Sequence, residues 1–258
     1  MASTPEFSGT ADERVICPVC LEDKTPEQRQ IGRRVIMIDH KCRCDREASE
    51  RAYAEEQARQ REEEIRQRID ASGLPARYQR STFEAFEPVK GAEKATALCR
   101  DYADEFSRSV EDGLLLRGPK GSGKTHLAAA LALGLLHRGF RVAFWNVPLV
   151  LDEIRSSFGA RDGREEKAAQ IMERARKADL LILDDLATEK PSDWVVERLY
   201  LVVEMRYQDL RPLIVTTNAS MKELEEALSP KTVSRLIEMC RGVSLEASDY
   251  RARRIRGR

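Results

Sequence analysis

The chain has 258 residues, of which 41% are hydrophobic and 34% are charged. Its length fits a core domain with one accessory piece, and its apolar content is sufficient for a real core. The 44 Lys and Arg residues balance the 44 Asp and Glu residues, so the chain is not a strongly basic nucleic-acid-binding protein. Any contact with nucleic acid would need a local basic patch or an assembly of several subunits.

The start of the chain and its apolar runs indicate where the protein resides. Residues 1–10 are small and polar, and they lack the basic start and apolar middle of a signal peptide. No apolar run reaches 18 residues, so we expect no membrane-spanning helix and no membrane partner. We therefore expect a cytoplasmic protein, in which the six cysteines stay reduced and serve as metal ligands or buried thiols.

Four cysteines near the N-terminus have the spacing of metal ligands. Cys17 and Cys20 form a C-x₂-C knuckle, and Cys42 and Cys44 follow as a tighter C-x-C pair. Four thiolates satisfy tetrahedral Zn²⁺, and a module this short buries too little apolar area to fold without the metal. Two alternatives stay open, because His40 could replace a cysteine as the fourth ligand, or the module could bind no metal.

A charged segment follows the cysteines. Residues 45–69 are almost entirely Arg, Glu, Gln and Ala, which predicts a solvated helix with many opposite charges at helical spacing. We expect a connecting helix, with a partner-binding helix as the alternative, and residues 73–75, Gly-Leu-Pro, end it. The predicted segments are a flexible tail at 1–14, a zinc-binding module at 15–47, a charged linker helix at 48–72 and a core domain at 73–258.

The rest of the chain alternates between short apolar strands and helices. Strands that alternate with helices predict an α/β fold, in which a parallel sheet has helices on both faces. The predicted strands are 114–117, 141–146, 180–183, 213–217 and 243–245. The predicted helices are 93–110, 125–138, 147–158, 164–177, 193–210, 221–228 and 231–240.

The loop between the first of these strands and the next helix matches the phosphate-loop pattern G-x-x-x-x-G-K-[ST] in full. Gly121 and Gly123 allow consecutive N–H groups to point inward at phosphates. Lys124 can reach the β- and γ-phosphates of ATP, and the Thr125 hydroxyl can ligate Mg²⁺. The residues predicted to bind ATP are Gly118, Pro119, Lys120, Gly121, Ser122, Gly123, Lys124 and Thr125.

Two carboxylates follow the apolar strand at 180–183. In parallel sheets ligands bind at the carboxyl ends of the strands, where these carboxylates would lie. Asp184 is predicted to hold Mg²⁺ together with Thr125, directly or through water, and Asp185 is predicted to orient or activate the attacking water.

Two further strands complete the predicted site. The strand at 141–146 comes between the phosphate loop and the two carboxylates, and we expect it to separate them, as in ATPases that polarise water with an acidic residue. Asn218 follows the strand at 213–217 and is predicted to lie beside the γ-phosphate and to help position water, although Asn is also a common turn residue.

Taken in their order along the chain, these motifs resemble those of a group of AAA+ ATPases. The group contains the DnaC/DnaI-type replicative helicase loaders and their relatives, the IstB-type transposase helper proteins. The resemblance covers roughly residues 73–252. The stretches that carry it are GLPARY at 73–78, TFEAF at 82–86, GPKGSGKTHLA at 118–128, LLILDDL at 180–186, EMRY at 204–207, TTN at 216–218, SRL at 234–236 and SDYR at 248–251.

The resemblance implies further site residues. Arg235 matches the arginine that reaches the γ-phosphate of a neighbouring subunit, which requires a homo-oligomer joined through the ATP site. Arg251 matches the family's second sensor arginine, in a basic tail at 251–258 that could equally touch nucleic-acid phosphates. The stretch with Phe83 and Phe86 matches the segment that borders the adenine, and packing in the core explains these two rings equally well. The short segment after Asn218 implies a reduced lid.

The resemblance also implies the function. A helicase loader would use ATP to place a DnaB-type replicative helicase on single-stranded DNA, with the zinc module and the charged helix as its helicase-binding arm. DnaI-type loaders carry such a module, which favours this hypothesis over a transposase helper that acts on duplex DNA. A nucleotide-gated adaptor without hydrolysis is a third hypothesis, and the complete set of predicted catalytic residues argues against it.

Overall fold

The computed structural model describes residues 14–32, 34–86, 91–157, 164–187 and 191–246. The chain divides into two compact units, Met1–Glu63 and Glu64–Arg258. We call them the cysteine unit and the sheet unit. Within the described residues, no helix is both long and apolar enough to cross a membrane.

The cysteine unit contains a hairpin that the sequence did not predict. β1 (Glu27–Ile31) pairs antiparallel with β2 (Arg34–Ile38). Every residue of the two strands is exposed except Ile38, which is half-buried. The prediction missed the hairpin because β1 reads Glu-Gln-Arg-Gln-Ile and lacks the apolar alternation of a strand that covers a core.

The charged segment is a helix, as predicted; it begins before the predicted start and ends at residue 72, the predicted end of the linker helix. α1 spans Arg43–Ser72. Glu47 lies within ion-pair distance of Arg43, at 3.9 Å, and of Arg51, at 3.6 Å, each one helical turn away. Such exposed pairs each contribute about 0.3–0.5 kcal/mol. Gly73 ends the helix with a φ of 80°, the left-handed conformation that glycine adopts without strain.

The sheet unit is built on a five-stranded parallel sheet, which confirms the predicted fold class. The strand order is β4-β5-β6-β3-β7, and every neighbouring pair is parallel. The strands are β3 (Gly113–Arg117), β4 (Val142–Asn146), β5 (Leu180–Asp184), β6 (Leu213–Thr217) and β7 (Cys240–Ser244).

One expectation about this sheet was wrong. The strand that separates the phosphate-loop strand β3 from β5 is β6, whereas β4 lies at the edge beyond β5. The sequence order placed β4 between them in the chain, but the pairing of strands in a sheet is set by tertiary contacts. The site therefore receives side chains from β6 between those of β3 and β5.

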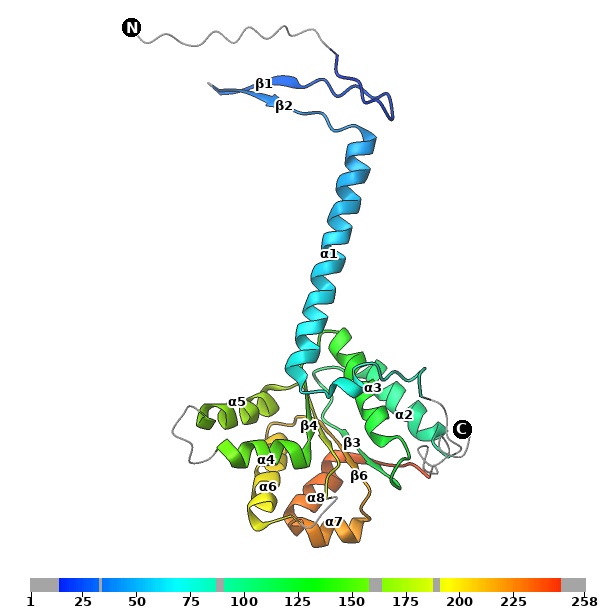
Figure 1. Cartoon of the computed structure of the whole chain (residues 1–258), viewed down its shortest axis with the longest axis vertical. Coiled ribbons are helices and arrows are strands. Elements are labelled where there is room, and N and C mark those ends of the chain that lie inside the picture. The colour runs from blue at the N-terminus through cyan, green and yellow to red at the C-terminus, as the bar shows by residue number, and fades with distance from the viewer. Residues whose placement is uncertain (1–13, 33, 87–90, 158–163, 188–190, 247–258) are drawn as a thin grey trace, which may run out of the picture. The chain divides into compact units, whose positions relative to one another are not determined.

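Helices cover both faces of the sheet, as predicted (Figure 1). α2 and α3 bury one face in a core that includes Leu114 and Leu116, whereas α4 to α8 bury the opposite face, which includes Leu115. The alternation of these three leucines follows the period of two in a strand. The helices are η1 (Ala76–Tyr78, a 3₁₀ turn), α2 (Glu93–Glu105), α3 (Lys124–His137), α4 (Val147–Ser157), α5 (Arg164–Lys177), α6 (Asp193–Gln208), α7 (Met221–Ala227) and α8 (Pro230–Met239).

Two elements differ from their predicted bounds for physical reasons. α2 ends at Glu105 and not at residue 110, because Phe106 has an extended backbone and its carbonyl accepts a hydrogen bond from the Arg138 guanidinium at 2.9 Å. β7 begins at Cys240 and not at residue 243, because its backbone pairs with β3 as soon as α8 ends.

A buried arginine ties the helices of one face to the sheet. The Arg206 side chain on α6 is fully buried and donates hydrogen bonds to four backbone carbonyls. Burial lowers its pKa to about 9, so the guanidinium stays charged at neutral pH. The acceptors are Ala175, Ala178, Asp179 and Pro212, which lie at the end of α5 and before β5 and β6.

We predict that Arg206→Met lowers the free energy of unfolding of the sheet unit by at least ~3 kcal/mol, because four buried carbonyls lose a charged donor. Arg206→Lys keeps the charge but cannot reach all four acceptors, so its loss should be intermediate. Urea unfolding followed by circular dichroism measures both. An unchanged midpoint for Arg206→Met would show that the carbonyls find other donors.

Candidate ATP site

The predicted phosphate loop joins β3 to α3. Gly121 and Gly123 have φ values of 78° and 96°, which turn the loop inward before α3 begins at Lys124. A side chain at Gly123 is excluded twice, by this conformation and because a Cβ would lie 2.4 Å from the Phe86 ring. The loop therefore brings the N-terminal N–H groups of α3 to its concave side, where anions bind.

The Lys124 ammonium is buried inside this loop. Its Nζ donates to the carbonyls of Gly118 and Pro119, both at 2.8 Å, and to Oδ1 of Asn218 at 2.7 Å. The side chain is 6% exposed and its charge is balanced by these oxygen dipoles. Phosphate oxygens are acceptors of the same kind with a full negative charge, so the loop fits the phosphates of ATP.

Asp184 lies at the end of β5 and shares its Oδ1 between two hydroxyls. Thr125 of the phosphate loop donates to it at 2.8 Å, and Thr216 of β6 donates at 2.7 Å. Burial raises the pKa of Asp184, against the hydrogen bonds from Thr216 and Thr125. A buried carboxylate beside a hydroxyl is a set of hard oxygen donors, so these residues fit Mg²⁺, whose charge would offset the cost of burying Asp184.

Asp185 and Asn218 meet beside this pair. The N–H of Asp185 donates to Oγ1 of Thr216 at 3.0 Å, and Nδ2 of Asn218 contacts Oδ1 of Asp185 at 3.4 Å. Asp185 has a φ of 64°, a left-handed conformation that costs a non-glycine residue about 1 kcal/mol. The hydrogen bond from its N–H holds this conformation and presents the carboxylate at the carboxyl edge of the sheet.

The structure thus gathers five of the predicted site residues at one edge of the sheet: Lys124, Thr125, Asp184, Asp185 and Asn218. Thr216 hydrogen-bonds to both aspartates, and no role was predicted for it from the sequence. The Thr-Thr-Asn sequence at the end of β6 could have indicated the role of Thr216, because side chains two residues apart in a strand point to the same face and Thr216 comes two residues before Asn218.

Arg235 lies in a different part of the sheet unit. It is on α8, and its guanidinium makes a two-pronged ion pair with Glu204 of α6, with Nη2 3.1 Å from Oε1 and a shorter contact through Nε. Its Cζ lies 4.3 Å from the centre of the Tyr207 ring. Arg251, the other predicted arginine, lies outside the described residues.

Phe86 packs directly on the phosphate loop. Its ring lies over Gly123, and its centre is 5.3 Å from that of the His126 imidazole. His126 in turn forms a hydrogen bond of 2.9 Å with the carbonyl of Thr82. Phe83 lies under the Arg100 guanidinium, with 5.3 Å between Cζ and the ring centre. The TFEAF stretch is therefore anchored to the start of α3, and the role of His126 as its partner was not predicted.

The four cysteines of the cysteine unit come together. The Sγ atoms of Cys17, Cys20, Cys42 and Cys44 all lie within 4.8 Å of one another, and tetrahedral Zn²⁺ requires a separation of about 3.8 Å. His40 instead pairs with Glu27 at 3.4 Å. The donor set therefore fits an all-cysteine Zn²⁺ site.

The thiols of this cluster differ in their readiness to lose a proton. The Glu22 N–H lowers the pKa of Cys20 to about 6, whereas burial raises the pKa of Cys42 to about 12. A bound Zn²⁺ would displace the proton of Cys42, so metal binding to the cluster would be coupled to proton release.

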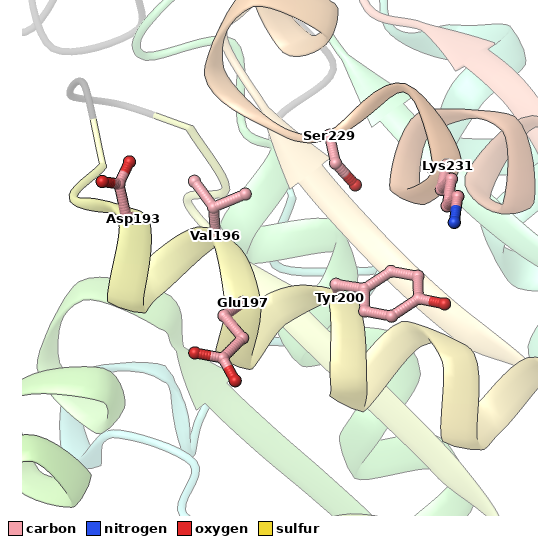
Figure 2. Close-up of a pocket in the computed structure, with 6 residues that line it drawn as sticks. All are labelled: Asp193, Val196, Glu197, Tyr200, Ser229 and Lys231. Carbon is pink, nitrogen blue, oxygen red and sulfur yellow. The ribbon is translucent and has the colours of Figure 1, made fainter.

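An open cavity of about 300 Å³ lies between the start of α6 and the start of α8 (Figure 2). It does not include any residue of the phosphate loop. The residues that line it are Asp193, Val196, Glu197, Tyr200, Ser229 and Lys231.

Comparisons with known proteins find similarity to ATP-binding proteins and to a helicase loader. A family model described as IstB-like ATP binding protein matches residues 44–257. The replicative helicase loader DnaC of Escherichia coli is 27% identical over 169 residues, which are 65% of this chain and 67% of that protein. A putative ATP-binding protein in an insertion sequence of Mycobacterium tuberculosis is 27% identical over 209 residues, or 77% of this chain and 81% of that protein. The crystal structure of the DnaC helicase loader superposes with a TM-score of 0.59 and 25% identity, covering 67% of this chain and all of that chain.

We predict that Lys124→Ala abolishes measurable ATP binding, because the phosphates lose their only buried ammonium among the described residues of the loop. Binding of a fluorescent ATP analogue and steady-state ATPase rates measure the effect. Lys222→Ala removes an exposed lysine of α7 and serves as the control. Normal ATPase activity of Lys124→Ala would contradict the assignment of the loop.

We predict one Zn²⁺ per chain, which Cys44→Ser removes and His40→Ala retains. Three thiolates hold the metal less tightly than four, whereas His40 lies outside the cluster. Metal analysis of the purified variants measures the content. Loss of zinc in His40→Ala with retention in Cys44→Ser would reverse the assignment of the fourth ligand.

Proposed function

The chain belongs to the family of IstB-like ATP binding proteins and is a P-loop ATPase of the AAA+ type. From this premise we propose that it loads a replicative ring helicase onto single-stranded DNA. The observation that carries the proposal is that one chain combines a loader-like ATPase part with an N-terminal cluster of four cysteines. The ATPase part is similar to a helicase loader over 65% of the chain. The family match begins at residue 44 and leaves Cys17, Cys20 and Cys42 outside it, in the proposed zinc-binding module.

The proposed role of the sheet unit is ATP hydrolysis. Lys124 would hold the β- and γ-phosphates, and Thr125 and Asp184 would hold Mg²⁺, which screens the phosphate charge. Asp185 would accept the proton of the attacking water, and Asn218 would orient that water. The hydrogen bonds that already join these side chains support this division of roles.

The proposed source of the last catalytic group is a second copy of the chain. Arg235 pairs with Glu204 on the surface formed by α6 and α8, and its side chain is 27% exposed. A guanidinium there can serve the ATP of a neighbouring subunit, where it would neutralise charge on the transferred phosphoryl group. Hydrolysis would then depend on a homo-oligomer joined through the ATP site.

The cysteine unit is the proposed helicase-binding arm. Its buried hydrophobic residues, among those described, are the thiols Cys17 and Cys42, whereas eight large apolar side chains between residues 15 and 37 are exposed. We call these eight residues the exposed apolar set; successive members on β2 point to opposite faces of the hairpin. Exposed apolar side chains in this number favour a protein partner over DNA. The members of the exposed apolar set are Val15, Ile16, Val19, Leu21, Ile31, Val35, Ile36 and Met37.

A transposase helper that acts on duplex DNA is the second candidate function. It is favoured by the insertion-sequence protein of Mycobacterium tuberculosis, whose match extends over 77% of this chain. The same ATP site would serve either function, so the partner of the cysteine unit distinguishes them.

We predict that Arg235→Ala binds ATP but hydrolyses it about 10³-fold more slowly, because charge on the transferred group is no longer neutralised. Mixing Arg235→Ala with Asp185→Asn should restore turnover, since each subunit supplies what the other lacks. ATPase rates across mixing ratios measure this restoration. No restoration at any ratio would contradict the trans role of Arg235.

We predict that the chain co-elutes with the replicative helicase of its own source in the presence of ATP, and that zinc chelation abolishes the complex. A Val35→Glu and Met37→Glu double variant should bind at least about tenfold more weakly, because both side chains share one face of β2. Leu210→Glu, an exposed leucine of the sheet unit, is the control. No complex under any condition would favour the transposase helper, and a transposase from the same source would be tested next.

A further inference from the structure

Arg235 is held by residues of its own chain. Glu204 pairs with the Nε and Nη2 edge of the guanidinium, and the Tyr207 ring lies against its face at 4.3 Å. Tyr207 is fixed in turn by a hydrogen bond of 3.0 Å from its hydroxyl to Glu238. These contacts join α6 to α8, so the guanidinium cannot rotate without breaking an ion pair.

Glu204 is itself held as a carboxylate. Hydrogen bonds from Arg235 above all, and also from Gln208 and Tyr200, keep the pKa of Glu204 below its ordinary range despite partial burial. The amide of Gln208 lies 2.9 Å from Oε1 of Glu204. The carboxylate therefore stays charged across the neutral range and accepts several donors at once.

One edge of the guanidinium remains available. Within the described part of the chain, Nη1 of Arg235 donates no hydrogen bond, whereas Nε and Nη2 are both engaged. Arg235 is 27% exposed and Glu204 17% exposed, so the pair lies at the surface rather than in the core. Tyr200, whose hydroxyl contributes to the lowered pKa of Glu204, also lines the open cavity between α6 and α8 (Figure 2).

We propose that Glu204 and Tyr207 are positioning residues, which fix Arg235 so that its Nη1 edge faces the ATP of a neighbouring copy of this chain. The inference rests on the proposed trans role of Arg235 and adds the residues that preorganise it. An unrestrained arginine would lose side-chain entropy each time it contacted the phosphoryl group. The ion pair and the ring already order the Arg235 side chain when the chain folds, so this entropy is not lost at the catalytic step.

The geometry favours a positioning role over a restraining one. A restraint would engage the whole guanidinium and keep it from the phosphate, but Glu204 engages only the edge formed by Nε and Nη2. The bidentate pair also fixes the plane of the guanidinium, which Tyr207 supports from one face.

The test uses mixed oligomers of the full chain. Asp185→Asn subunits supply Arg235 but do not hydrolyse ATP, and Arg235→Ala subunits supply the only working sites. Glu204→Gln is then added to the Asp185→Asn subunit, where the new side-chain amide replaces one acceptor by a donor. We expect the restored kcat to fall about tenfold to a hundredfold, as small misplacements of a catalytic group do, with KM for ATP unchanged because the working site is intact.

Two further variants keep the test decisive. Tyr207→Leu in the same donor subunit should lower kcat in the same manner, whereas Tyr207→Phe keeps the ring and should retain most of it. Glu173→Gln breaks an exposed carboxylate–arginine pair on α5 and is the matched control. Thermal unfolding and sedimentation of each donor show whether it folds and joins the oligomer.

The outcomes separate this inference from the function on which it rests. If Asp185→Asn alone fails to restore turnover, the trans role of Arg235 is wrong and the inference falls with it. If it restores turnover, but folded donors with Glu204→Gln and with Tyr207→Leu restore it equally well or better, then the trans role stands and the positioning role is wrong.

Discussion

The parallel alignment of β5, β6 and β3 is the constraint on which the ATP site depends. It brings the carboxyl ends of three strands to one edge, so that side chains far apart in the sequence share hydrogen bonds. Lys124 reaches Asn218 across 94 residues of chain, and Thr125 reaches Asp184 across 59. A shift of β6 by one residue would turn Thr216 and Asn218 to the other face of the sheet and would break both links to the site at once.

Two buried cations of the sheet unit are stabilised in different ways that match their roles. Arg206 is surrounded by four backbone carbonyls, which cannot leave without unfolding the ends of α5, β5 and β6. Lys124 depends on two loop carbonyls and on the Asn218 amide, a side chain that can rotate. The first arrangement has only backbone acceptors, whereas the second includes a side-chain acceptor that a phosphate oxygen could replace.

Local motifs were predictable from the sequence, and pairings between distant residues were not. The phosphate loop and the Asp184–Asp185 pair are contiguous, so their residue types and the flanking strands were sufficient to locate them. The position of β6 between β3 and β5 depends on which strands pair, which no local pattern encodes. The hairpin of the cysteine unit was missed for a related reason, since its strands cover no core and so carry no apolar alternation. The contact between Glu204 and Arg235 was not predictable from the sequence either. The two residues are 31 positions apart, and only the packing of α6 on α8 brings them together.

The two units of the chain differ in how much apolar surface they bury, and therefore in what can stabilise them. The sheet unit buries two apolar cores, one on each face of its sheet, and can therefore leave polar groups at one edge for chemistry. The cysteine unit has almost no buried apolar area among its described residues, so a metal at the four thiols would have to supply what a core supplies elsewhere. Its apolar side chains are then not needed inside and stay on the surface, where a partner can bury them. A metal bound at the four thiols would link the two features, because it would order the segment that carries the exposed apolar residues.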